Sequence, residues 1–336
     1  MAEKNITPPM ANNDEPLLVV RDLNVEFKVQ DGMVRAVNGL SFKVYNSEII
    51  GIVGESGSGK SQTMLALMGL LANNGKVSGS VKFIGQELIG LSTAKLNKIR
   101  GDQIAMIFQD PMTSLNPYLK ISSQMTEVLM LHKGMKYQEA LAESIKMLDR
   151  VKIPDAKNRI HLYPHEFSGG MRQRVMIAMS LLTRPKLLIA DEPTTALDVT
   201  VQAQILELLK ELKQELNMSV IFITHDMGVV ANICDRINVM YGGWLMETAT
   251  IGQVFNDPEH PYTRALLGTI PDLETNDTML KTIPGEPPNL LHLPVGCPFQ
   301  ERCDFVSVAC RGEIPLRKIA PRHVMKCTLL PKGDQS

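Results

Sequence analysis

Eight consecutive residues near the start of the chain have the types and spacing of a loop that binds phosphate. They fit the pattern G-x-x-x-x-G-K-[ST], and they read Gly54, Glu55, Ser56, Gly57, Ser58, Gly59, Lys60 and Ser61. Glycines let the backbone curl so that its N–H groups face phosphates, and a helix from about Lys60 adds its positive end. Lys60 would reach the β and γ phosphates of a nucleotide, and the Ser61 hydroxyl would bind Mg²⁺. The alternative is an ordinary glycine turn, which the apolar run before the loop and the helix after it disfavour.

Two carboxylates follow a later apolar run, Leu187 to Ala190. Asp191 would face the Mg²⁺ shell, and Glu192 would polarise a water molecule for attack on phosphate. Acidic residues at this position are more often a solvated strand end or a helix cap. The phosphate loop upstream favours the catalytic interpretation.

Two further apolar runs, Ile104 to Phe108 and Val220 to Thr224, end in Gln109 and His225. Either residue taken alone would be read as a surface or structural side chain. Beside a γ-phosphate, Gln109 would contact Mg²⁺ or water, and His225 would donate a hydrogen bond to the phosphate.

The elements that must position these residues are short apolar runs alternating with longer helical patterns. This alternation predicts an α/β fold with a mainly parallel sheet. The run from Glu48 to Val53, which ends at Gly54, is one of four that end in a chemically useful group. Ligands of open α/β sheets lie beyond the carboxyl ends of the strands, so the four endings are expected to converge on one site.

Bulk composition indicates a globular protein of two domains, or one large domain with an appendage. The chain has 336 residues, 44% of them apolar, and 35 basic against 36 acidic residues. Near-zero net charge gives no reason to expect a nucleic-acid or anionic-membrane partner. We find no run of about 20 apolar residues, and segment 1–15 is polar, so we expect a flexible N-terminus and a cytosolic protein.

One more segment, Phe167 to Arg174, begins with Phe, Ser, Gly, Gly and Met. Together with the phosphate loop and the acidic strand end, it resembles the signature motif of the ATP-binding cassette (ABC) family. That resemblance implies an ABC-type P-loop NTPase over residues 16–255. Such a fold has a RecA-like core with a mainly parallel sheet, an antiparallel β subdomain and an α-helical subdomain at about 110–180.

The signature residues Ser168, Gly169 and Gly170 precede a predicted helix, Arg172 to Leu182, whose N-terminus favours an anion, and Ser168 would also cap it. The resemblance implies that two cassettes pair head to tail, with these residues closing over the ATP held by the other chain. It further implies that Asp198 belongs to a loop across that interface. Phe27 matches the aromatic residue that stacks on adenine, although a Phe in a β-rich segment is also typical of a core.

Three segments resemble the ATPase subunits of dipeptide and oligopeptide importers, with the oligopeptide importers the closer group: 109–117, 260–263 and the Cys-rich end. The resemblance implies peptide uptake with a paralogous second ATPase subunit, two transmembrane permease subunits and, indirectly, a peptide-binding protein. It places the chain at the cytoplasmic side of the inner membrane, peripherally. A nickel or other small-solute importer remains an alternative. A soluble nucleic-acid-associated ABC ATPase would usually carry a coiled-coil insertion or two cassettes, and neither is visible. A subunit that only binds ATP is disfavoured by Glu192 and His225.

Four of the five cysteines lie in a proline-rich extension, 256–336, separated by five, six and sixteen residues: Cys297, Cys303, Cys310 and Cys327. This spacing lacks the tight pairs common in zinc sites, yet four thiolates could hold zinc or an iron–sulfur cluster, or remain free thiols. Similar importer subunits are understood to carry a 4Fe-4S cluster here, which would clamp the extension structurally. Cys234 is expected to be an ordinary buried residue.

Overall fold

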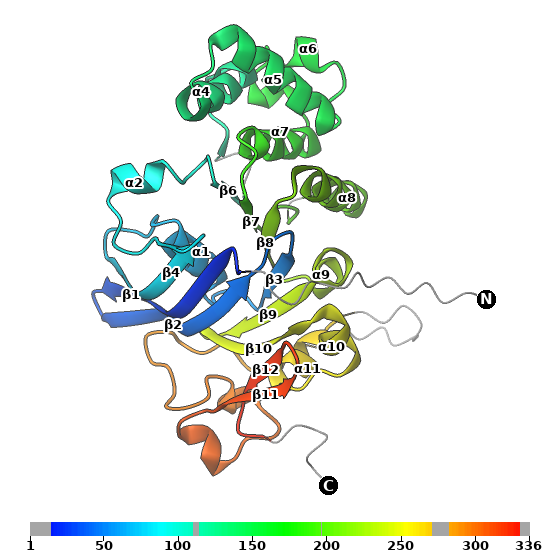
Figure 1. Ribbon diagram of the computed structural model, residues 1–336. Coiled ribbons are helices and arrows are strands. Elements are labelled where there is room, and N and C mark those ends of the chain that lie inside the picture. The colour runs from blue at the N-terminus through cyan, green and yellow to red at the C-terminus, as the bar shows by residue number, and fades with distance from the viewer. Residues whose placement is uncertain (1–14, 110–113, 196, 271–281, 330–336) are drawn as a thin grey trace, which may run out of the picture.

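The computed structural model describes residues 15–109, 114–195, 197–270 and 282–329. Two sheets organise these residues, an eight-stranded central sheet and a four-stranded antiparallel sheet (Figure 1). Almost all of the segment predicted to be a flexible N-terminus lies outside the described residues.

The central sheet has the strand order β11-β12-β10-β9-β3-β8-β7-β6. Its five strands from β9 to β6 are parallel: β9 Arg236–Tyr241, β3 Ile49–Val53, β8 Ser219–Thr224, β7 Leu187–Asp191 and β6 Ile104–Ile107. Antiparallel strands extend one edge: β10 Trp244–Thr250, β12 His323–Lys326 and β11 Leu316–Ala320. The predicted α/β fold with a mainly parallel sheet is therefore confirmed for the described residues.

The inner parallel strands are apolar on both faces because the chain covers them on both sides. In β3, Ile49 and Val53 face one hydrophobic core, and Ile50 and Ile52 face the other. This explains why the sequence shows continuous apolar runs there.

The second sheet lies over one face of the central sheet in the order β2-β1-β4-β5. Its strands are β1 Leu18–Val29, β2 Gly32–Val44, β4 Gly75–Phe83 and β5 Gln86–Glu87. Two helices accompany it, α1 Lys60–Leu67 and α2 Thr93–Asn97. The core between the two sheets includes residues of α1, so this layer fixes the helix that follows the phosphate loop.

Helices form a separate layer at the top of Figure 1. They are α4 Ile121–Lys133, α5 Tyr137–Arg150, α6 Ala156–Arg159, the 3-10 helix η1 Pro164–Glu166 and α7 Gly169–Leu181. The helices of this layer begin at Ile121 and end at Leu181. Below this layer, three further helices contribute to the core that Ile49 and Val53 of β3 face: α8 Val199–Leu216, α9 Met227–Ile233 and α10 Ile251–Asn256.

The C-terminal segment packs against the main body. It contains α11 Pro261–Leu267, the short 3-10 helices η2 Gln300–Arg302 and η3 Val308–Arg311, and strands β11 and β12. Strand β12 pairs with β10, and Cys297, Phe299 and Ile314 are buried in the same core as the helices. The segment thus continues the central sheet and shares its core.

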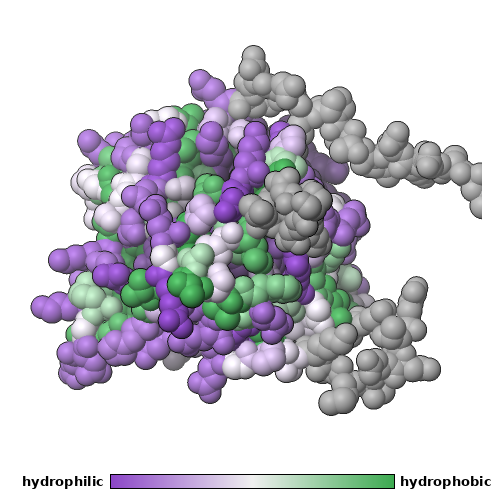
Figure 2. Space-filling model, turned by 90° about the horizontal axis from the view of Figure 1, so that it is seen from below, coloured by the Kyte–Doolittle hydropathy of each residue, from purple (hydrophilic) through white to green (hydrophobic). Residues whose placement is uncertain are grey.

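Figure 2 shows the face of the molecule that lies at the bottom in Figure 1. Most of this face is hydrophilic, with smaller apolar areas near its middle. Within the described ranges, none of the helices combines the length and the apolar character that crossing a membrane would require.

Candidate nucleotide site

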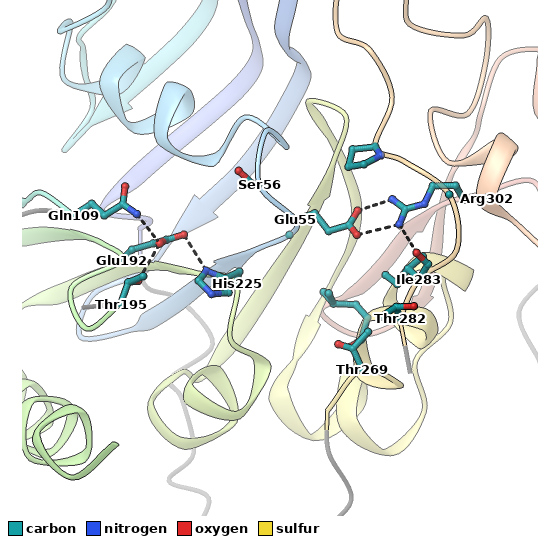
Figure 3. Close-up of a pocket in the computed structure, with 14 residues that line it drawn as sticks. Glu55, Ser56, Gln109, Glu192, Thr195, His225, Thr269, Thr282, Ile283 and Arg302 are labelled. Atoms are coloured by element: carbon teal, nitrogen blue, oxygen red, sulfur yellow. Dashed lines mark hydrogen bonds and ion pairs between the residues drawn. The ribbon is translucent and has the colours of Figure 1, made fainter. Parts of the chain in front are cut away.

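Four neighbouring parallel strands bring their carboxyl ends to one edge of the sheet. The register pairs Val53 with Thr224 and Ile107 with Ala190, so the strands end nearly level. The residues that follow them, Gln109, Glu192 and His225, point toward one another beside the loop after β3 (Figure 3). The structure therefore brings together the polar residues that follow these strands, as the sequence predicts.

The loop after β3 requires glycine where the backbone of two other segments of the same chain approaches it closely. Gly54 has φ +155° and Gly59 has φ +96°, both in the region that side chains rarely adopt. A Cβ atom at Gly54 would overlap the carbonyl oxygen of Met240, and one at Gly59 would overlap that of Ala36. The backbone can therefore curl tightly before α1 begins at Lys60.

Lys60 is buried, and its ammonium group rests on the loop itself. Nζ donates to the carbonyl oxygens of Gly54 at 2.7 Å and Glu55 at 2.9 Å, and to Oγ of Ser58 at 3.4 Å. Burial lowers the pKa of Lys60, while the charges of Glu192, Asp191 and Glu55 oppose that shift. A buried ammonium group binds a phosphate anion more strongly than it binds neutral carbonyl oxygens, so a phosphate is expected to replace these carbonyls as the partner of Lys60.

Asp191 lies at the end of β7, next to Ser61. Burial raises the pKa of Asp191, a hydrogen bond with Ser61 lowers it, and the charge of Glu192 raises it again. Its Oδ1 atom is buried without a hydrogen-bond partner among the described residues. A buried, unpaired carboxylate oxygen beside a hydroxyl is a donor set that suits Mg²⁺.

Glu192 is held by contacts from three different segments. Its Oε2 accepts hydrogen bonds from Nε2 of Gln109 and Oγ1 of Thr195, both at 2.9 Å. Its Oε1 lies 3.2 Å from Nδ1 of His225. The backbone φ of Glu192 is +46°, a costly conformation for a residue with a side chain. The carboxylate is thus held in one orientation by a backbone conformation that costs energy, and such strained residues cluster at active sites.

Thr195 was not among the residues predicted for this site. It follows Glu192 by three positions, and its hydroxyl reaches back to the carboxylate. The tight turn after β7 decides this contact, and a Thr two residues after a Pro is too common in turns to signal it from sequence.

Two cavities of several hundred cubic ångströms adjoin the loop. One of about 380 Å³ is lined by the phosphate-loop residues and Gln109 and Glu192, and Phe27 lines it too. Phe27 is half-buried at the cavity wall, a position that suits contact with a base. The other, of about 750 Å³, lies between Glu192 and the C-terminal segment and is lined by His225, Thr195 and Arg302 among others.

The signature residues lie elsewhere in the chain. Ser168 caps α7 by accepting a hydrogen bond from the Met171 backbone N–H at 3.3 Å, and Asp198 caps α8 through Val201 at 2.9 Å. Neither these two residues nor Gly169 and Gly170 line the cavity beside Lys60. These residues therefore lie at the N-termini of α7 and α8 and outside the cavity beside Lys60.

The four C-terminal cysteines gather around one small cavity, together with His260 and Phe299. Cys297, Cys310 and Cys327 are buried and Cys303 is half-buried, and none forms a disulfide in the described chain. In that same part of the chain, no three His, Cys, Asp or Glu side chains are arranged to hold one metal ion. Cys234 is buried as expected, and its burial raises the pKa of the thiol.

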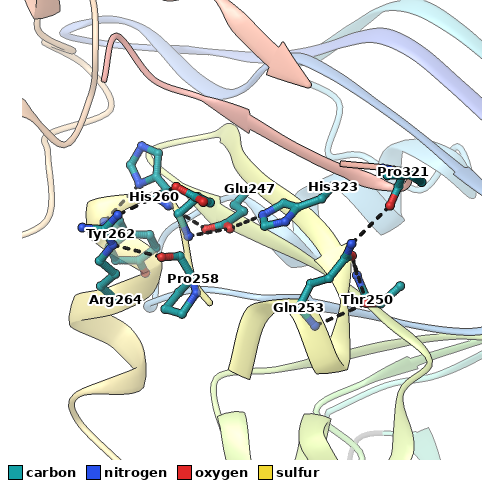
Figure 4. A network of polar contacts seen from close by, with 10 residues as sticks. Glu247, Thr250, Gln253, Pro258, His260, Tyr262, Arg264, Pro321 and His323 are labelled. Carbon is teal, nitrogen blue, oxygen red and sulfur yellow. Dashed lines mark hydrogen bonds and ion pairs between the residues drawn. The ribbon is translucent and has the colours of Figure 1, made fainter. Parts of the chain in front are cut away.

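A buried polar network ties the C-terminal strands to β10 (Figure 4). Oε1 of Glu247 lies 2.7 Å from Nε2 of His323 and accepts from the Glu259 N–H at 3.0 Å, and Oε2 accepts from the His260 N–H at 3.0 Å. Burial alone would raise the pKa of Glu247, but these hydrogen bonds lower it. The network fixes the start of α11, and it was not anticipated from sequence because its members are scattered over 76 positions.

Comparison with known families identifies two regions. The model described as ABC transporter matches residues 37–195, and the model described as oligopeptide/dipeptide transporter, C-terminal region, matches residues 246–310. The second match covers most of the segment that carries the cysteines.

Comparison with individual proteins gives long matches. The oligopeptide transport ATP-binding protein OppD of Haemophilus influenzae is 64% identical over 88% of this chain and 92% of its own. OppD of Escherichia coli is 58% identical over 96% of each chain. Among solved structures, a dimeric ATP-binding cassette in a post-hydrolysis state with ADP and Pi bound matches with a TM-score of 0.63. It is 26% identical, covering 70% of this chain and 98% of that chain.

Proposed function

The chain belongs to the family of oligopeptide transport ATP-binding proteins of ABC transporters, and we propose that the residues around Glu192 are where it hydrolyses ATP. It is the ATP-binding and ATP-hydrolysing subunit that powers peptide import. The observation that carries the proposal is the contact of Gln109, Thr195 and His225 with one carboxylate beside the phosphate loop.

ATP binding begins with the exchange of partners by Lys60. The ammonium leaves the carbonyl oxygens of Gly54 and Glu55 and binds the β and γ phosphates, while the loop N–H groups and the N-terminus of α1 bind the remaining oxygens. Phe27 contacts adenine from the wall of the same cavity.

Hydrolysis is an in-line attack of water on the γ-phosphate. Glu192 accepts the proton of the attacking water, and Gln109 and Thr195 keep its carboxylate in one orientation. His225 donates to the γ-phosphate, and Lys60 offsets the charge that develops there.

Asp191, Ser61 and Gln109 would hold Mg²⁺, since Asp191 offers an unpaired buried oxygen next to the Ser61 hydroxyl. The ion supplies charge neutralisation on the phosphate oxygens.

A second cassette completes the site. Ser168, Gly169 and Gly170 begin α7 away from Lys60 of the same chain, so they are available to a nucleotide held by a partner. We expect the partner to be a paralogous subunit paired head to tail, with Asp198 near the shared interface. ATP then bridges both chains, and loss of the γ-phosphate opens them.

The membrane side of the assembly follows from the family. Two transmembrane permease subunits receive the motion through the surface near Gln109 and the layer α4–α7, and a peptide-binding protein supplies the substrate. The chain lies peripherally on the cytoplasmic face of the inner membrane. Proteoliposomes with the permease subunits should import peptide only with hydrolysable ATP. Peptide-independent copurification with nucleic acid instead would overturn this assignment.

For the cysteine cavity we propose a 4Fe-4S cluster. All four cysteines line the same cavity. A 4Fe-4S cluster is larger than a single metal ion, so its four thiolate ligands need not converge on one point. When bound, the cluster supplies a covalent clamp between the chain segments that carry Cys297, Cys303, Cys310 and Cys327.

Iron and sulfide analysis of anaerobically purified protein, with an absorbance spectrum, tests the cluster. We expect about four irons per chain, as the cluster type requires. Stoichiometric zinc, or a colourless, iron-free protein that is well folded, would overturn it.

A further inference from the structure

The C-terminal segment reaches the phosphate loop through one ion pair. Arg302, the last residue of η2, forms a bidentate ion pair with Glu55, the second residue of the loop: Nη1 lies 2.6 Å from Oε2, and Nη2 lies 3.1 Å from Oε1 (Figure 3). The two residues are 247 positions apart. The pair therefore joins the segment that carries the cysteines directly to the loop that carries Lys60.

The guanidinium of Arg302 is fully engaged where it stands. It also donates to the Tyr241 hydroxyl at 3.1 Å and to the carbonyl oxygens of Ile283 at 3.0 Å and Pro284 at 2.8 Å. The side chain is 4% exposed. Such a saturated, buried fork holds its partner in one geometry.

The backbone of Glu55 is held from the same side. Its N–H donates to the Tyr262 hydroxyl at 3.0 Å, and Tyr262 packs on Tyr241 and Phe299 with ring centroids 4.6 and 5.2 Å away. Its carbonyl oxygen accepts from Lys60. Glu55 thus supplies one of the three acceptors that hold the lysine of the loop.

A carboxylate is an unfavourable side chain on a loop that binds a triphosphate, because like charges repel. Here the Glu55 side chain points toward Arg302 and away from Gln109, Glu192 and His225 (Figure 3). Arg302 both neutralises this charge and holds it on the far side of the loop.

We propose that Arg302 is a positioning residue of the ATP site: it neutralises and orients Glu55 so that the phosphate loop can accept a triphosphate. The proposal rests on the phosphate-loop function proposed above. Arg302 does not touch the reacting atoms.

If the ion pair only stabilises the fold, removing either partner should change ATP affinity in the same direction. If Arg302 acts on the loop electrostatically, removing Arg302 and removing Glu55 should have different effects on ATP affinity. Arg302→Gln leaves an unpaired carboxylate beside the phosphates, whereas Glu55→Gln leaves a cation there. The sign of the change in ATP affinity separates the two roles.

The experiment measures binding of ATP and adenosine to the purified full chain, and KM and kcat in the assembled complex. For Arg302→Gln we expect ATP affinity to fall about tenfold, or ~1.4 kcal/mol, with adenosine binding unchanged and KM affected more than kcat. Glu55→Gln should bind ATP at least as well as wild type. The double variant should recover most of the loss.

Two arginines of the same segment serve as controls. Arg311→Gln makes the same charge change at an exposed position. Arg317→Gln removes donors to the carbonyl oxygens of Cys327 at 3.1 Å and Thr328 at 3.3 Å, so it loosens the segment without touching the loop. Both should bind ATP like wild type.

The proposal is overturned if Glu55→Gln and Arg302→Gln weaken ATP binding alike, if the double variant is no better than Arg302→Gln, or if Arg317→Gln reproduces the loss. Lys60→Ala distinguishes this failure from failure of the phosphate loop itself. If Lys60→Ala loses ATP while Arg302→Gln does not, only the role of Arg302 is wrong.

Discussion

Nε2 of Gln109 donates to Oε2 of Glu192 at 2.9 Å, across 83 positions of sequence and between the ends of two adjacent strands. The contact shows that the carboxylate of Glu192, which follows β7, is oriented by a residue that follows the neighbouring strand β6. A catalytic base needs this restraint, because a freely rotating carboxylate spends little time aligned with the attacking water.

Replacing Glu192 by Gln should keep ATP binding and remove turnover. The amide has the shape of the carboxylate but cannot accept a proton, so we expect ATPase activity to fall by about a hundredfold to ten-thousandfold. The variant should accumulate in a closed, ATP-loaded pair of cassettes, measurable by size-exclusion chromatography with ATP. Glu207→Gln, an exposed position on α8, is the control. Undiminished turnover would contradict the role given to Glu192.

Replacing Lys60 by Ala should weaken binding of ATP and ADP directly, by about a hundredfold or more, since a buried charge-assisted contact with phosphate is lost. Calorimetric titration of the isolated chain measures this. Wild-type affinity in that variant would disprove the phosphate-loop assignment.

Replacing Ser168 by Asp separates its two roles. Asp is as good an N-cap as Ser, so α7 should remain stable, but a carboxylate would face the phosphates of the partner's nucleotide. We expect unchanged thermal unfolding, unchanged ATP binding to Lys60 of the same chain, and loss of ATP-driven pairing and transport. Normal transport would rule out the signature role.

Replacing Phe27 by Ala should reduce ATP affinity about three- to tenfold by removing contact with the base, and Phe27→Tyr should retain most of it. Triphosphate alone should bind both variants equally. If only thermal stability falls, Phe27 is a core residue and no more.

Replacing Glu247 by Gln should destabilise the C-terminal strands, by about 3 kcal/mol at neutral pH, because His323 loses a buried anionic partner. The hydrogen bonds lower the pKa of Glu247 below its ordinary value, so its contribution is present above pH 4.5 and is lost as the pH falls through the folded pKa. Urea unfolding of both proteins should therefore converge below pH 4.5. A constant difference at every pH would contradict this linkage. Glu211→Gln, which breaks a surface pair with Lys152, should cost at most about 1 kcal/mol.

Strand ends and the phosphate loop were predictable because their signals are local. An apolar run long enough to be buried on both faces, followed at once by Gly54, Gln109, Glu192 or His225, specifies both the strand and the group at its end. The sequence predicts the start of the helix after Ser168 three residues late, at Arg172 instead of Gly169, since glycines at positions 169 and 170 obscure a helix start that the cap makes favourable.

Contacts of the C-terminal segment could not be read from the chain. Nothing near Arg302 in the sequence points to Glu55, and Glu247 and His323 meet only because β12 pairs with β10. Similarly, the four cysteines were visible as a set, but their convergence on one cavity depends on how η2, η3 and β12 pack against Phe299 and His260.

By itself, the sequence determined the family, the chemistry and the strand ends that carry it, because residue types at fixed spacing encode a loop that binds phosphate and two carboxylates after a buried strand. Only the tertiary structure decided that Thr195 and Gln109 orient Glu192, and that Arg302 of the distant C-terminal segment holds Glu55 of the loop. The physical reason is that hydrogen bonds and ion pairs act over a few ångströms, so they follow the packing of elements and not their order along the chain.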